Sequence, residues 1–103
     1  MNQVVDEHKI QYEELAYPRV NINGSSAADL ERQYRLVYET LDHAYEVMAA
    51  NPPHGRDYQT APRGEYDKAA KEHADRMKRL LAIGTEVMSI RMQLHNQRRQ
   101  ERK

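Results

Sequence analysis

Residues 51–66 read NPPHGRDYQTAPRGEY and separate two long segments whose apolar residues both have helical spacing. The stretch holds three prolines and two glycines, which are the two poorest helix formers. We therefore expect a turn here and a chain that folds back on itself as an antiparallel helical hairpin. A plain hairpin turn needs no special chemistry. This one carries two arginines, a histidine, an aspartate and two tyrosines, which makes it the first place to look for a function.

The segment before the turn predicts a helix over residues 26–50. Ser25 and Ser26 are candidate N-caps, and Asp29 in the first turn favours the helix dipole. Apolar residues then recur at steps of four and three, namely Leu30, Tyr34, Val37, Leu41, Ala44 and Met48.

The segment after the turn predicts a longer helix over residues 65–98 with two adjacent stripes on one side. The first stripe is Ala69, His73, Arg76, Leu80, Ile83, Val87, Ile90 and Leu94. The second is Ala70, Ala74, Met77, Leu81, Gly84, Met88 and Met92. A single partner helix needs one stripe, so a wide face predicts a second partner. Glycine weakens a helix, and Gly84 therefore suggests that another backbone packs closely there.

Three regions follow from this pattern: an N-terminal extension (1–23), a helical-hairpin domain (24–98) and a basic tail (99–103). In the extension we expect a short helix that ends at Pro18, then an extended arm that leads into the Asn23-Gly24 turn. The predicted second helix is longer than the first and extends past it. Its last third must therefore be covered by residues 1–22 or by another subunit. A lone helix pair buries too little surface at this size. We therefore expect a homo-oligomeric helix bundle, a dimer or larger, with an interface of Tyr34, Tyr38, Tyr45, Leu81, Gly84, Met88 and Met92.

Composition narrows the class of protein. The 103 residues amount to one domain, with 31% charged residues and a mean hydropathy of −1.02. No apolar run is long enough to span a membrane, and the absence of cysteine suits a reducing compartment, so we expect a cytoplasmic protein. Residues 1–50 carry a net charge of −5 and residues 51–103 a net charge of +5, which suits packing of one half on the other. Zero overall charge argues against a general nucleic-acid-binding protein.

The polar residues of the turn have two interpretations. The first is a structural clasp in which Asp57 pairs with Arg76 and Tyr58 covers the turn. The second is a site for a small anion, in which arginines supply bidentate donors, a tyrosine stacks and the helix N-terminus offers free amides. Its residues would be His54, Arg56, Asp57, Tyr58, Arg63, His73 and Arg76.

Catalysis and metal binding have weaker support. Histidines and an aspartate could act as general acids or bases, but no nucleophile with a base nearby is evident. Glu72 and His73 are adjacent and point in different directions on a helix, and no known metal motif is present. We expect no enzyme activity, no cofactor and no metal.

The run INGSSAADL, a helix, PHGRDY and a second helix with EHADR together resemble a group of small uncharacterised phage and prophage proteins over residues 20–95. In that group the turn more often reads HGRDYY followed by Gln-Gly, where this chain has Gln59 and then APRG. The resemblance implies an all-α fold and the cytoplasm of a phage host.

In that setting we expect a non-catalytic protein that sequesters a small nucleotide-derived anionic signal. Two alternatives remain open: an inhibitor or adaptor that binds a host protein through its helix faces, and a nucleic-acid accessory protein that uses the basic end.

Overall fold

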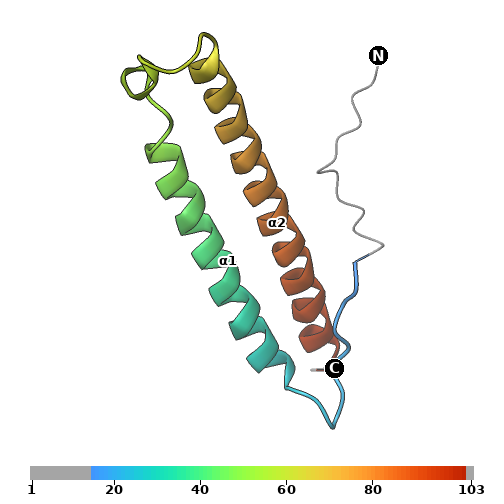
Figure 1. Ribbon diagram of the computed structural model, residues 1–103. Coiled ribbons are helices and arrows are strands. Elements are labelled where there is room, and N and C mark those ends of the chain that lie inside the picture. Colours follow the sequence, from blue (N-terminus) through green and yellow to red (C-terminus); the bar gives the residue numbers. More distant parts are fainter. Residues whose placement is uncertain (1–14, 102–103) are drawn as a thin grey trace.

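The computed structural model describes residues 15–101 as a hairpin of two α-helices (Figure 1). Helix α1 (Ala27–Ala50) is joined to helix α2 (Glu65–Glu101) by a turn that contains the short 3₁₀ helix η2 (Gly55–Tyr58). The described residues contain no strand. The predicted all-α hairpin is therefore confirmed, and both helices begin and end within three residues of their expected positions.

The ends of α1 are set by local capping. Ser26 is the N-cap, and its Oγ accepts a 3.1 Å hydrogen bond from the Asp29 amide. At the other end, the Asn51 amide donates to the Met48 carbonyl at 3.1 Å. Pro52 and Pro53 follow and offer no amide hydrogen to continue the helix.

Helix α2 begins after Gly64, which has a φ of 86°. This left-handed backbone conformation favours glycine, because a Cβ would meet the following carbonyl oxygen. The Glu65 amide donates to the Pro62 carbonyl at 3.1 Å and closes the turn. With 37 residues against 24 in α1, α2 extends well past the start of α1, as the sequence indicated.

The last turns of α2 are covered by a segment of the same chain, residues 15–20, which we call the N-terminal strap. The Gln97 side chain holds the strap by its backbone: its Oε1 accepts from the Val20 amide at 2.8 Å, and its Nε2 donates to the Pro18 carbonyl at 2.9 Å. The Tyr17 and Ser89 hydroxyls share a further hydrogen bond of 2.8 Å. After the strap, the Gly24 amide donates to the Asn21 carbonyl at 3.2 Å and turns the chain into α1.

The structure tests two predictions about the N-terminal extension, one fully and one in part. Residues 17–20 supply the cover that the last third of α2 was expected to need, and they have no helix or strand. The short helix expected near the N-terminus falls mostly on residues 1–14, which lie outside the described residues. The predicted basic tail starts one turn too early, because α2 continues through Arg99 and Gln100 to Glu101.

The core is small and lies where the strap, the start of α1 and the end of α2 meet. Among the described residues only Ala27 and Leu94 are buried, with exposed fractions of 4% and 0%. Several large apolar side chains are exposed instead, among them Leu36, Leu81, Ile83 and Met92.

One expectation about the face of α2 is wrong, and a second is not met within the chain and stays a prediction for an assembly. Arg76 was placed in the inward stripe, but its side chain is 54% exposed and pairs with Glu72 one turn away. A long arginine side chain keeps its charged end in water at little cost. The close backbone approach expected at Gly84 does not occur inside the hairpin, because a Cβ there would meet only the Tyr38 ring, at 4.0 Å.

Candidate functional site

The turn residues lie at the tip of the hairpin, opposite the end where the strap packs (Figure 1). The structure exposes His54, Arg56, Asp57 and Arg63, whereas Tyr58 is half-buried. The rings of Tyr58 and Tyr66 pack together with their centroids 5.9 Å apart and their planes tilted by 54°. This ring pair brings η2 against the first turn of α2 and fixes the shape of the tip.

The predicted clasp between Asp57 and Arg76 does not form. Arg76 instead approaches Glu72 at 3.9 Å, and both side chains are about half exposed. Within the described residues, Arg56 and Arg63 make no ion pair and no side-chain hydrogen bond. The two guanidinium groups at the tip are therefore available to a ligand.

His73 lies on the inner side of α2 near the tip. Its Nε2 atom is buried and has no hydrogen-bond partner among the described residues. A buried polar atom without a partner costs free energy, and because solvent does not reach this atom, a ligand could bond to it only after the side chain moved. His73 and the tip arginines thus belong to one end of the molecule, while Arg76 points to solvent.

The predicted interface residues gather partly around one hollow between α1 and α2, which we call the apolar groove. It has a volume of about 160 Å³ and is lined by Tyr38, Leu41, Tyr45, Leu80, Leu81 and Gly84, with Asp42 and Thr85 at its edge. Gly84 contributes no side chain, so the groove is open above it. Tyr34 is half-buried elsewhere on α1, and Met88 and Met92 line a different groove nearer the helix ends.

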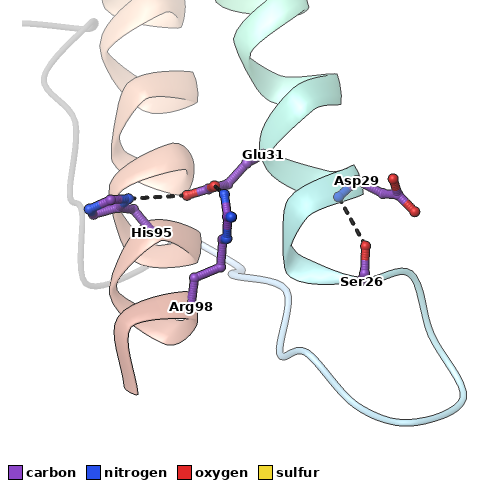
Figure 2. Close-up of polar contacts among 5 residues, drawn as sticks. All are labelled: Ser26, Asp29, Glu31, His95 and Arg98. Atoms are coloured by element: carbon purple, nitrogen blue, oxygen red, sulfur yellow. Dashed lines mark hydrogen bonds and ion pairs between the residues drawn. The ribbon is translucent and has the colours of Figure 1, made fainter. Parts of the chain in front are cut away.

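At the other end of the hairpin, Glu31 of α1 joins two basic residues of α2 (Figure 2). Its carboxylate accepts a 2.5 Å hydrogen bond from Arg98 Nη1 and lies 3.4 Å from His95 Nδ1. The Glu31 side chain is only 18% exposed. The sequence pattern does not reveal this junction because its residues are far apart in the chain, although the acidic first half and basic second half are a signal for such pairing.

The first turn of α1 also holds an ion pair, between Asp29 and Arg32. Arg32 Nη1 lies 2.9 Å from Asp29 Oδ1. This hydrogen bond, with a smaller contribution from Ser26, lowers the pKa of the Asp29 carboxyl below its ordinary value of 3.8. Asp29 therefore stays charged at the positive end of the helix dipole at neutral pH.

No three His, Asp or Glu residues within the described part of the chain are placed to hold a metal ion. Neither α1 nor α2 contains a stretch that is both long and apolar enough to cross a bilayer. The basic end is partly engaged within the chain, because Arg98 already bonds to Glu31.

The fold and the site define an all-α helical hairpin with a polar, arginine-bearing tip. No protein-family model, no curated protein and no solved structure matches the chain significantly.

Proposed function

We propose that this chain is a non-catalytic binding protein that captures a small nucleotide-derived anion at the tip of its hairpin. The supporting observation is that Arg56 and Arg63 are exposed and unpaired among the described residues, in the same turn region as the Tyr58–Tyr66 ring pair. The expected intramolecular partner of the tip, Arg76, is held by Glu72 instead. Cations without a structural role next to aromatic rings suit a ligand with phosphates and a base.

Each group at the tip has a distinct role in this proposal. Guanidinium groups form paired hydrogen bonds with phosphate oxygens, and a tyrosine ring can stack on a base. His54 supplies a further hydrogen bond, and His73 would add one if its side chain turned to expose the buried Nε2, while Asp57 accepts from a ribose hydroxyl or a base edge. In the cytoplasm of a phage host, such a protein would sequester a nucleotide immune signal without cleaving it.

We also propose that the hairpin acts as a homo-oligomeric helix bundle. The apolar groove and the exposed Leu81 give a second copy an apolar surface to cover. Assembly would also bring several tips together and raise the number of arginines that one ligand can reach.

Isothermal titration with a panel of mono-, di- and cyclic nucleotides tests the function. A variant that combines Arg56→Ala and Arg63→Ala is expected to lower the affinity of the tip for its nucleotide at least tenfold with an unchanged melting temperature, because neither side chain has a partner in the chain. Lys78→Ala with Arg99→Ala removes the same charge from exposed positions on α2 and is the matched control. A wild-type protein that binds no nucleotide, or an equal loss in the control, would sink the proposal.

The apolar groove also supports a second candidate, an inhibitor or adaptor that binds a host protein through its helix faces. This candidate predicts that the protein recovers one stoichiometric partner from host lysate. Leu81→Glu should abolish that binding, and the Arg56→Ala, Arg63→Ala variant should keep it. Leu81 is 57% exposed, so this change removes an apolar surface contact without opening the core.

A further inference from the structure

A second cluster of arginines lies at the opposite end of the hairpin from the tip. There the start of α1 and the end of α2 border a groove of about 560 Å³. Its charged lining residues, which define what we call the arginine groove, are Glu31, Arg32, Arg35, Arg91, His95 and Arg98. None of the sequence predictions assigned a role to this groove as a whole.

The arginine groove carries more positive charge than the chain neutralises. Four guanidinium groups face a single carboxylate, that of Glu31, which is already committed to Arg98 and His95. Arg32 pairs outside the groove with Asp29. An excess of cations along one hollow attracts anions and concentrates the field there.

Two of the four arginines are free to bind a further anion. Arg35 is exposed and makes no ion pair or hydrogen bond with the described residues. Arg91 lies over the Tyr38 ring, with its guanidinium carbon 5.6 Å from the ring centroid. A cation–π contact orients a guanidinium group but leaves its N–H donors open to an acceptor. Arg91 is therefore held in place by α1 and still able to bind a phosphate.

The lining also limits the class of ligand. Met88 and Met92 add apolar surface to the groove, and the Met92 side chain is 55% exposed. A volume of about 560 Å³ lies within the range of small-molecule sites. Several arginines favour more than one negative charge, and the methionines favour a ligand with a ring to contact.

We propose that the arginine groove is a second anion site, which binds a nucleoside polyphosphate through Arg35 and Arg91 and contacts its base with Met88 and Met92. The site is separate from the tip. Helix α2 rises about 40 Å between Glu65 and Arg91, so one small molecule cannot reach both ends. The inference does not depend on whether the tip binds a ligand.

Isothermal titration of ATP into the Arg56→Ala, Arg63→Ala variant isolates this groove, because the tip arginines are then absent. Saturable binding is expected in that background, with at least a tenfold loss when Arg35→Ala and Arg91→Ala are added. Arg35→Ala alone, at an exposed position without a partner, should weaken binding several-fold and leave the melting temperature unchanged. Adding Lys71→Ala and Lys78→Ala instead is the matched control, and it should change the affinity by less than twofold.

Three results would overturn the proposal: no ATP binding in the tip-free background, equal losses in the arginine and lysine variants, or equal affinity for ATP and inorganic pyrophosphate. The last of these would mean that the methionines contact no base. The proposed function is judged separately, by comparing the wild-type protein with the tip variant, so either site can fail alone.

Discussion

The carboxylate of Glu31 on α1 accepts a 2.5 Å hydrogen bond from the guanidinium of Arg98, which lies 67 residues further along the chain on α2. The Glu31 side chain is 18% exposed and the Arg98 side chain 35% exposed, so the pair is only partly screened by water. It joins the start of α1 to α2 four residues after Leu94, the one fully buried large side chain among the described residues.

Replacing Glu31 by Gln should lower the free energy of unfolding by about 1 kcal/mol, because the amide keeps the shape but loses the charge attraction to Arg98. Urea unfolding followed by circular dichroism measures the change. Glu39→Gln, at an exposed position on α1 without an ion pair in the described residues, is the control and should have no measurable effect. Equal unfolding midpoints for the two variants would show that the junction adds no stability.

The N-cap gives a second prediction. Ser26→Ala removes the acceptor of the Asp29 amide and should cost about 1 kcal/mol of stability. Ser25→Ala, one residue earlier and outside the cap, should cost almost nothing. The same unfolding experiment distinguishes them, and a larger effect at Ser25 would mean that the helix begins elsewhere.

The ion pair beside the cap predicts a pH dependence. Arg32→Ala should raise the pKa of Asp29 towards its ordinary value of 3.8, because it removes the largest cause of the lowering. A carboxyl whose pKa is depressed by folding stabilises the protein above its unfolded pKa, and that stability is lost as the pH falls through the folded pKa. The contribution of Asp29 is therefore complete at neutral pH, begins to fall near its ordinary pKa of 3.8 and is lost as the pH falls through the lower pKa of the folded state. A carbon-detected NMR titration of Asp29 checks the direction, and an unchanged pKa in the variant would contradict it.

The strap predicts a local effect on exchange. Gln97→Ala removes two hydrogen bonds to the strap backbone and should destabilise the protein by about 1–2 kcal/mol. The Val20 amide should then exchange its hydrogen with solvent much faster, while amides in the middle of α1 should change little. Gln100 borders the same part of the strap and makes no hydrogen bond to it among the described residues, so Gln100→Ala is the control. Slow exchange of Val20 in the Gln97 variant would show that other contacts hold the strap.

A substitution at Gly84 tests the stability of the single chain and its association with a second copy independently. Alanine there meets only the Tyr38 ring at an ordinary distance of 4.0 Å, so Gly84→Ala should raise the stability of the single chain by up to about 1 kcal/mol through helix propensity. If a second copy packs its backbone over the apolar groove, the added methyl should instead weaken association. Native mass spectrometry and thermal melts at two protein concentrations give the two values independently. Unchanged association together with higher stability would place the subunit contact away from Gly84.

The helices could be predicted from the sequence because the signals that set them are local. Ser26 with Asp29, the double proline after Asn51 and the glycine before Glu65 each act within one helical turn. Apolar residues at steps of three and four then continue along α1, and along α2 with His73, Arg76 and Gly84 as exceptions. None of these features depends on how the two helices meet.

The predicted clasp between Asp57 and Arg76 was wrong because Glu72, on the same helix as Arg76, pairs with it instead. Glu72 is four residues from Arg76 on α2, a spacing at which side chains meet without folding the turn at all. Asp57 would have required Arg76 to turn inward and lose water. Sequence spacing alone gave no measure of that cost.

The arginine groove was missed because its halves are far apart in the chain. Arg32 and Arg35 are three residues apart on α1, and Arg91, His95 and Arg98 follow at steps of four and three on α2. Each set lies on one face of one helix, and its spacing can be read from the sequence. That the two faces border the same groove depends on the register of the hairpin, which the sequence pattern did not determine.

The way Gln97 holds the strap has a consequence for the order in which the chain folds. Its contacts with Pro18 and Val20 span 79 and 77 residues, whereas contacts near the turn join residues close in sequence. Short loops close at lower entropic cost, so the hairpin should zip from its tip towards its open end, with the strap docking last. On a ribosome, the strap must wait until Gln97 has emerged, and until then Leu94 and the end of α2 have no cover from it.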